Sequence, residues 1–112
     1  MSQPSGVLAE LMRVIDERKA TRPANSYTTK LLDGGVAKIG AKIGEEAAEV
    51  VEAAAEPGPP GREHLIREAA DLIYHLLVML ALRDAQLSEV ETELARRFGI
   101  SGLDEKAGRQ GR

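Results

Sequence analysis

Hydrophobic residues recur at helical spacing through most of the chain, and no segment alternates as a strand would. The first apolar stripe consists of Val7, Leu8, Leu11, Met12 and Ile15. It predicts a helix that starts near Val7, with Ser5 placed to cap it. The proline-containing segment TRPANS at residues 21–26 ends this helix.

The second stripe is interrupted by a glycine pair. Ser26 or Asn25 can cap a short helix that runs from Tyr27 to Leu32, and Gly34 with Gly35 ends it. A long helix is then expected over residues 36–56, because apolar positions again recur at helical spacing. The sequence PGPPG at residues 57–61 stops that helix.

Two further helices complete the expected fold. The third covers residues 62–84, and the fourth starts at a capping box formed by Ser88 and Glu91, ends near Phe98 and is terminated by Gly99. Glycines and charges dominate residues 100–112, which predicts a fraying tail. We expect one all-α domain over residues 1–112, an antiparallel bundle of about four helices and a short one, with an ordered core of about 5–98.

The faces of the two long helices predict a partner. On the second, an apolar arc is expected to consist of Val36, Ile39, Ile43, Ala47, Val50, Val51 and Ala54, with Glu46 at its border. The third is apolar almost all round between Leu72 and Leu82, so it has to be covered on every side. Because a short chain has few helices to do this, we expect a homodimer to complete the bundle.

Composition narrows the classes of function. The net charge is -3 and basic residues are not clustered, which argues against a nucleic-acid partner. The absence of cysteine excludes thiolate metal sites and cysteine catalysis. The apolar run at 72–82 is about half of the roughly 20 residues that a membrane span needs, and the N-terminal residues do not read as a signal peptide. A cytoplasmic protein without a membrane segment is therefore expected.

Carboxylates are concentrated on the two helices that flank the PGPPG turn. The segment KIGAKIGEEAAEVVEAAAE carries Glu45, Glu46, Glu49, Glu52 and Glu56, with its lysines all at the front. Glu68 and Asp71 follow on the next helix, with His75 on the same stripe. If the helices are antiparallel, Glu49 and Glu68 come level at roughly 10 to 12 Å from the loop. So many like charges would be costly unless a cation offsets them.

Oxygen ligands without a histidine and cysteine cluster suit Mg²⁺ or Mn²⁺ better than zinc. Such ions support hydrolysis of a phosphate chain, and Lys30, Lys38 and Lys42 are candidates to contact its oxygens. From spacing alone, a solvated acidic face remains an open alternative. For His75, a histidine satisfied within the helix packing is favoured over a metal ligand, and Lys30, taken alone, is favoured as an ordinary surface lysine.

The acidic residues fit a known signature. Glu45-Glu46-x-x-Glu49 followed by Glu68-x-x-Asp71 resembles the EExxE and ExxD motifs of the all-α, MazG-like nucleoside triphosphate pyrophosphatases. The blocks SYTTKLLDGG, EAADLIYHLLVML and RRFGISGLDEKAGR further resemble the phosphoribosyl-ATP pyrophosphohydrolase family of histidine biosynthesis. This resemblance extends from about Val7 to Arg109.

The resemblance implies a homodimeric bundle, Mg²⁺ dependence, and hydrolysis of phosphoribosyl-ATP to phosphoribosyl-AMP and pyrophosphate. It assigns the metal to Glu46, Glu49, Glu68 and Asp71. Glu45 is a ligand to a second ion or supports the ligands, and Glu45 or Glu49 is the candidate base for the attacking water. Tyr27 and Thr28 are expected to border the nucleotide.

Two rival functions remain open at the level of sequence. A house-cleaning pyrophosphatase acting on other nucleoside or deoxynucleoside triphosphates would use the same carboxylates. A non-enzymatic helical dimerisation module would explain the apolar third helix, but it gives no reason for acidic residues on two facing stripes.

Overall fold

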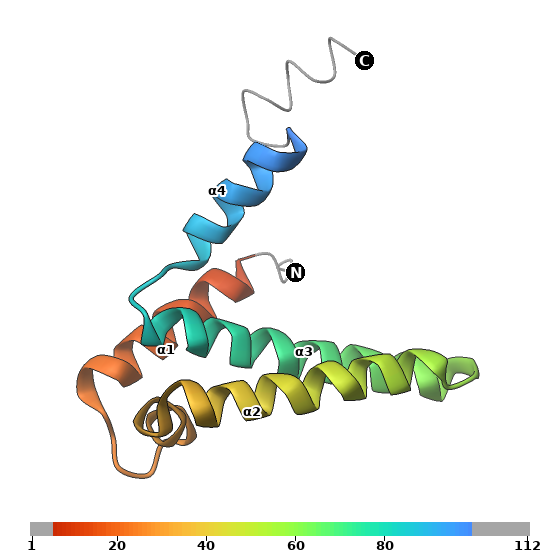
Figure 1. The fold of residues 1–112 in the computed structure, drawn as a ribbon, viewed down its shortest axis with the longest axis horizontal. Coiled ribbons are helices and arrows are strands. Elements are labelled where there is room, and N and C mark those ends of the chain that lie inside the picture. Colours follow the sequence, from red (N-terminus) through yellow and green to blue (C-terminus); the bar gives the residue numbers. More distant parts are fainter. Residues whose placement is uncertain (1–5, 100–112) are drawn as a thin grey trace, which may run out of the picture.

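The structure is a computed structural model that describes residues 6–99, and it is all-helical over that range. Four helices follow one another: α1 (Val7–Thr21), α2 (Tyr27–Ala55), α3 (Gly58–Leu82) and α4 (Leu87–Phe98). Figure 1 shows α2 and α3 as a long antiparallel hairpin, α1 crossing one end of it, and α4 extending away. The predicted tail at 100–112 and the predicted cap Ser5 lie outside the described residues.

The first half of α2 confirms the expected break at the glycine pair. The Ser26 side chain accepts a hydrogen bond from the Thr29 backbone N–H at 3.2 Å, as its predicted role as a cap requires. Gly35 has φ 68° and ψ -161°, which no other residue type adopts readily, and the helix bends there. A Cβ on Gly34 would stand 2.5 Å from the Cβ of Lys38, so the bend also needs a bare backbone at that position. The expected short helix and long helix are therefore two segments of α2.

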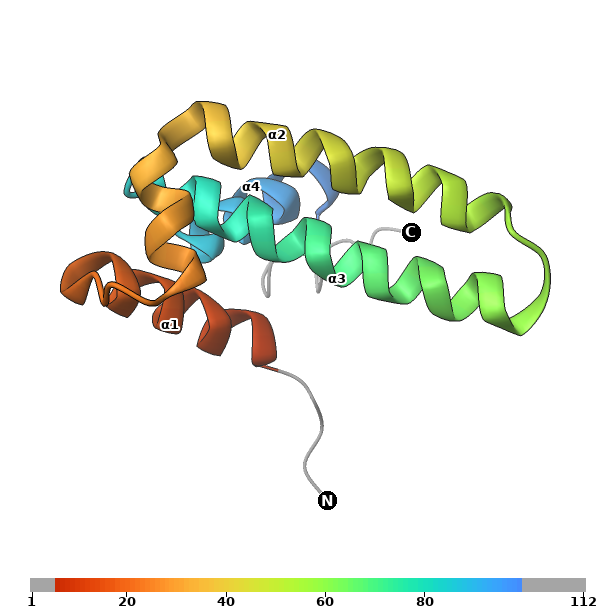
Figure 2. The ribbon, with the colours of Figure 1, turned by 90° about the horizontal axis from the view of Figure 1, so that it is seen from below.

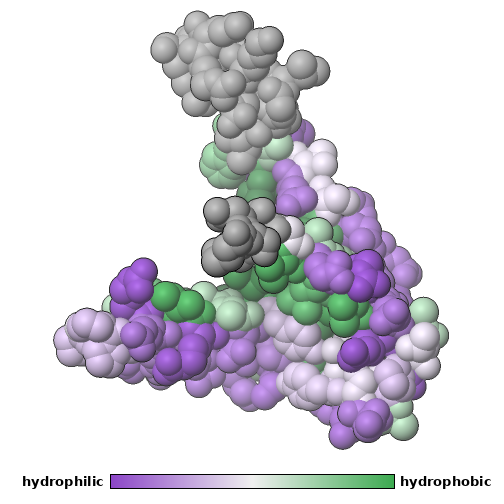
Figure 3. Space-filling model, turned by 180° about the vertical axis from the view of Figure 1, so that it is seen from behind, coloured by the Kyte–Doolittle hydropathy of each residue, from purple (hydrophilic) through white to green (hydrophobic). Residues whose placement is uncertain are grey.

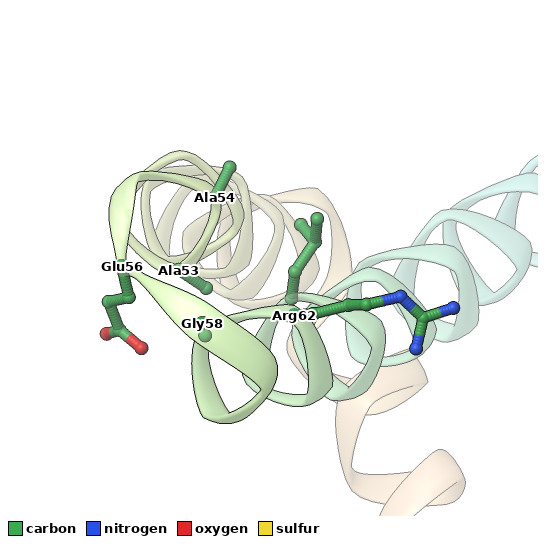
Figure 4. A pocket seen from close by; sticks show the side chains of 7 residues that line it. Ala53, Ala54, Glu56, Gly58 and Arg62 are labelled. Carbon is green, nitrogen blue, oxygen red and sulfur yellow. The ribbon is translucent and has the colours of Figure 1, made fainter.

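The turn between α2 and α3 is shorter than the PGPPG sequence predicts. Helix α3 begins at Gly58 and not at Arg62, because Pro59 and Pro60 occupy its first turn, where the missing N–H groups have no intrahelical partner to lose. Gly61 is buried against the end of α2: a Cβ there would lie 2.3 Å from the Glu56 carbonyl oxygen. Figure 4 shows the side chains of Glu56 and Arg62 leaving this turn on opposite sides.

The last two boundaries also differ from expectation. Helix α3 ends at Leu82, two residues before the predicted end. The capping box of α4 is made by Gln86 and Glu89 and not by Ser88 and Glu91. The Gln86 side chain donates to Asp16 on α1 at 2.9 Å, and this tertiary contact favours the earlier start. Gly99 ends the helix with φ 66°, as predicted.

The hydrophobic core lies at the end of the hairpin that α1 crosses (Figure 2). Its buried members are Met12, Ile15, Leu31, Leu32, Ile39, Leu77, Val78 and Ala81. Each is at most 4% exposed, so this end resembles the interior of an ordinary globular domain. None of the helices within residues 6–99 is long and apolar enough to cross a membrane.

The inward face of α2 coincides only in part with the predicted apolar arc, with which it shares Ile39 and Ile43. Ile39, Glu46 and Ala53, spaced seven residues apart, are buried against the rest of the chain. Val36 and Val51, which belong to the predicted arc, are 60% and 70% exposed. The stripe that faces α3 therefore runs through a glutamate, and part of the apolar face of α2 is left uncovered by this chain.

Candidate active site

Three carboxylates from the two arms of the hairpin meet at mid-length. Glu46 of α2 and Glu68 and Asp71 of α3 each offer an oxygen, and these oxygens lie within 4.8 Å of one another. Antiparallel packing brings the residues together, because Glu46 lies before the turn and Glu68 and Asp71 lie one helical turn apart after it. The two predicted acidic stripes therefore meet through Glu46, Glu68 and Asp71, whereas Glu49, which the sequence places level with Glu68, lies outside this group.

Glu46 is the most confined member of the three. Its side chain is 9% exposed, whereas Glu68 is partly buried and Asp71 is exposed. Burial, together with the nearby charges and hydrogen bonds of Asp71, Glu68 and Glu49, raises the pKa of Glu46 to about 7. Within residues 6–99 none of the three acids has a lysine or arginine partner; their only ion pairs are with histidine. Their negative charge is left largely uncompensated by the protein.

This donor set fits a divalent cation. Three carboxylates from two rigid helices supply hard oxygen ligands, and one of them is held in a buried position where a proton or a cation is needed to neutralise it. Because the three grouped ligand atoms are all carboxylate oxygens, the site favours Mg²⁺ or Mn²⁺ over zinc.

The other acidic candidates are arranged differently. Glu49 is exposed and outside the group of three, but it is close enough to Glu46 to raise the pKa of that residue. Glu45 is 63% exposed and lies 3.6 Å from the ammonium group of Lys42. Glu52 is exposed and has no ion pair within the described residues, as expected for ordinary surface charge.

The three predicted phosphate-contacting lysines differ in their surroundings. Lys30 and Lys38 are exposed. Lys42 is partly exposed, and its pKa is raised by the nearby Tyr27 hydroxyl and by Glu45. Lys42 is thus the lysine that the structure places beside other candidate site residues.

A cluster of rings adjoins the acidic residues. Tyr27 and Tyr74 are stacked with their ring centroids 6.2 Å apart, and His75 meets both rings edge-on. The Thr28 hydroxyl is hydrogen-bonded to that of Tyr74. Tyr27 remains 47% exposed, so one surface of this cluster is open to solvent. These are the only two tyrosines in the sequence, and both rings meet His75, which lies beside Glu46.

His75 connects the rings to the carboxylates. It is buried, and its Nδ1 lies 2.8 Å from the Asp71 carbonyl oxygen and 3.7 Å from Glu46 Oε1. Because a carbonyl oxygen only accepts, Nδ1 carries a proton, and in the neutral ring Nε2 accepts from the Tyr27 hydroxyl at 3.1 Å. Both ring nitrogens of His75 therefore have hydrogen-bond partners, as expected of a histidine satisfied within the helix packing. The ring nevertheless lies at the edge of the acidic site.

His64 is a site neighbour that the pattern of acids did not single out. Its Nε2 lies 3.2 Å from Glu68 Oε2, and its Nδ1 lies 3.0 Å from Glu56 Oε1. The spacing of four residues between His64 and Glu68 is a signal in the sequence, since such pairs share a helix face. The contact to Glu56 depends on the turn and has no comparable signal.

Comparison with known proteins identifies the family. The family described as Phosphoribosyl-ATP pyrophosphohydrolase matches residues 8–98, which is most of the chain. The chain belongs to the phosphoribosyl-ATP pyrophosphohydrolase family. All of the acidic, lysine and tyrosine candidates fall inside the matched range.

Individual members of this family are similar along nearly their whole length. A protein of Rhodopirellula baltica named phosphoribosyl-ATP pyrophosphatase is 57% identical over 91% of this chain and 85% of its own length. Proteins of the same name from Rhizobium etli and Paramagnetospirillum magneticum are 50% and 49% identical. They cover 92% and 97% of this chain, and 94% and 97% of their own lengths. The resemblance seen in the sequence blocks is thereby confirmed.

Proposed function

We propose that this protein hydrolyses phosphoribosyl-ATP to phosphoribosyl-AMP and pyrophosphate, a step of histidine biosynthesis. It is an enzyme with a small-molecule nucleotide substrate, as its family membership and its similarly named relatives support. The observation that carries the proposal is the meeting of Glu46, Glu68 and Asp71 between two antiparallel helices of a chain from this family. These residues supply what a triphosphate needs for binding through a divalent cation.

The cation we propose is Mg²⁺, with Mn²⁺ as a substitute, held by Glu46, Glu49, Glu68 and Asp71. The bound ion supplies positive charge to the triphosphate and acidity to a coordinated water. The grouped carboxylates and the raised pKa of Glu46 support this choice of ligands. Glu49 enters the set through its proximity to Glu46 and through the family motif.

The remaining residues divide the chemical work. A water attacks the α phosphorus, the bond from that atom to the oxygen shared with the β phosphorus breaks, and pyrophosphate leaves. Glu49 or Glu45 accepts the proton of the water. Of these, Glu49 is adjacent to the buried acid, whereas Glu45 pairs with Lys42 and supports the ligands or a second ion. Lys30, Lys38 and Lys42 contact the phosphate oxygens as point charges.

Tyr27 and Thr28 border the nucleotide. The open ring of Tyr27, stacked on Tyr74, offers a flat surface of the kind on which bases stack. Its hydroxyl is held by His75, so the ring has a defined orientation next to the carboxylates. Thr28 fixes the second ring through its hydrogen bond to Tyr74.

We also propose that the functional unit is a homodimer. Apolar side chains on several helices stay exposed in one chain: Val36, Val51, Ile66, Ile73, Leu76, Val90, Leu94 and Phe98. Figure 3 shows hydrophobic residues gathered in the angle between α4 and the hairpin. A second copy that buries this surface would cover α3 on all sides, as its composition requires. The single domain over residues 1–112 and the cytoplasmic location remain predictions.

One assay tests the activity and its specificity together. The protein is incubated with phosphoribosyl-ATP and with a panel of other nucleoside and deoxynucleoside triphosphates, with and without Mg²⁺, and pyrophosphate is measured. We expect release from phosphoribosyl-ATP and only with the metal. Preference for another triphosphate would favour the house-cleaning alternative, and no release from any would favour a dimerisation module. Light scattering of the same sample reports the oligomeric state.

A further inference from the structure

The only two histidines of the chain both contact the acidic site, but they do so differently. His75 uses one nitrogen for the Asp71 backbone and the other for Tyr27. His64 instead places a carboxylate on each nitrogen: Glu68 on Nε2 at 3.2 Å and Glu56 on Nδ1 at 3.0 Å. His64 thus links an acid of the site to an acid that is not part of it.

Glu56 is held in place by the turn. It is the residue directly after α2, and its backbone N–H donates to the Ala53 carbonyl at 3.1 Å. Gly61 packs so closely against it that a Cβ would stand 2.3 Å from the Glu56 carbonyl oxygen. The backbone that carries this carboxylate is therefore fixed on both sides, and both Glu56 oxygens lie within 3.1 Å of His64 Nδ1.

We propose that His64, oriented by Glu56, is a positioning residue that holds the Glu68 carboxylate ready for a divalent cation. The inference rests on the proposed function, because it presumes that Glu68 is a metal ligand. One Glu68 oxygen faces His64, which restricts the rotation of the carboxylate about its side chain. Partners that orient ligands in this way contribute to metal affinity even though they do not touch the ion.

The charges of the linkage are compatible with this role. Glu56 and Glu68 only accept hydrogen bonds when ionised, so His64 donates from both nitrogens as an imidazolium. The negative charge of Glu56 offsets the positive ring, so Glu68 gains a donor while the local charge seen by a cation changes little.

The test measures Mn²⁺ binding by the whole protein, without nucleotide, using calorimetry or the electron paramagnetic resonance of free Mn²⁺. We expect His64→Ala to weaken binding about 10- to 100-fold, the usual effect of losing such a partner. His64→Gln keeps an amide donor and is expected to retain most of the affinity. Glu56→Gln should weaken binding more than Glu52→Gln, which removes the same charge from an exposed position in the last turn of α2.

Several outcomes separate this inference from the proposed function. If wild type binds Mn²⁺ and Glu68→Gln does not, but His64→Ala binds within twofold of wild type, the role of His64 is wrong and the metal site stands. If wild type itself does not bind, both are wrong. Tighter binding by His64→Ala would mean that the histidine competes with the cation, which also overturns the inference.

Folding and turnover provide independent readouts. Far-ultraviolet circular dichroism checks that each variant is helical. If His64→Ala is not helical, the Mn²⁺ affinities of Glu56→Gln and Glu52→Gln decide whether the linkage through His64 supports the metal site. In the pyrophosphate assay, His64→Ala should need more Mg²⁺ for half-maximal rate and should approach the wild-type kcat at saturating Mg²⁺. A kcat that stays low at every Mg²⁺ concentration contradicts a positioning role.

Discussion

The two ends of the α2–α3 hairpin are built from the same pair of helices but from opposite kinds of side chain. Toward α1, the helices meet through Ile39, Leu77 and Val78, each at most 3% exposed. Toward the turn, the buried contacts are made by the small residues Ala53 and Gly61, and the partly buried positions include Glu68 and His64. Glu46 lies between the two regions.

The difference shows how a small chain can hold an unfavourable cluster of charges. Burial of the aliphatic end stabilises the helix pairing, and the helices then carry the acidic end in register. Small residues near the turn let the backbones approach closely, as the 2.3 Å from a Cβ on Gly61 to the Glu56 oxygen illustrates. We infer that the aliphatic end provides stability and that the acidic end uses part of it for function.

The largest expected effect comes from breaking the acidic end. Asp71→Asn or Glu49→Gln should lower turnover by more than about 100-fold, the upper range for residues that only support metal ligands. The helical fold should remain, because both side chains are exposed. Pyrophosphate release and circular dichroism measure the two properties, and Glu52→Gln is the control. Near wild-type turnover in either variant would refute the assignment of that residue.

Breaking the aliphatic end should have the opposite outcome. Ile39→Ala removes a side chain with no exposed surface and should cost about 2–5 kcal/mol of the free energy of unfolding. Denaturant unfolding measures the loss. Val51→Ala, at a position 70% exposed, should change stability by less than about 0.5 kcal/mol in a single chain. A loss at Val51 that grows with protein concentration would instead indicate its burial in a dimer.

The stability of the protein without metal should depend on pH through Glu46. The pKa of Glu46 is raised to about 7 from 4.5, so the folded protein without metal binds a proton that the unfolded chain releases. Its stability should therefore fall as pH rises from about 4.5 to 7, by up to roughly 3 kcal/mol. Denaturant unfolding in the presence of EDTA, repeated across this pH range, measures how the free energy of unfolding changes with pH. Glu46→Gln should flatten the profile, and parallel profiles would show that Glu46 is not responsible.

Above this pH range, added Mg²⁺ should raise the stability that the loss of the proton lowers. It binds the ionised carboxylates and so competes with the proton on Glu46. At pH 8 the melting temperature of wild type should rise with added Mg²⁺, and that of Glu46→Gln should rise less. Melting that ignores the metal in both proteins would favour a solvated acidic face.

The smallest expected effect concerns the turn. Gly61→Ala places a methyl group 2.3 Å from the Glu56 carbonyl oxygen, and the shift needed to relieve it should cost about 1–3 kcal/mol. Thermal unfolding measures this. Gly44→Ala is the matched control, because a Cβ there meets nothing within 4 Å. Equal stability of the two variants would show that the turn yields easily.

Local features of the helices were predictable from the sequence because they depend on neighbouring residues. The Ser26 cap, the bend at Gly35 and the stop at Gly99 each follow from the chemistry of one or two side chains. Boundaries that involve distant residues were less predictable. The start of α4 moved to Gln86, whose side chain reaches Asp16 on another helix. The start of α3 at Gly58 could have been anticipated, since prolines are common in a first helical turn.

The sequence by itself determined the family, the all-helical class and the acids that face each other across the turn. These follow from residue types at fixed spacings along the helices. Only the tertiary structure decided which face of α2 is inward, so that Glu46 is buried while Val36 and Val51 are exposed. It alone brought Glu56 to His64. The rotation of one helix against another depends on the fit of both surfaces, and neither surface by itself contains that information.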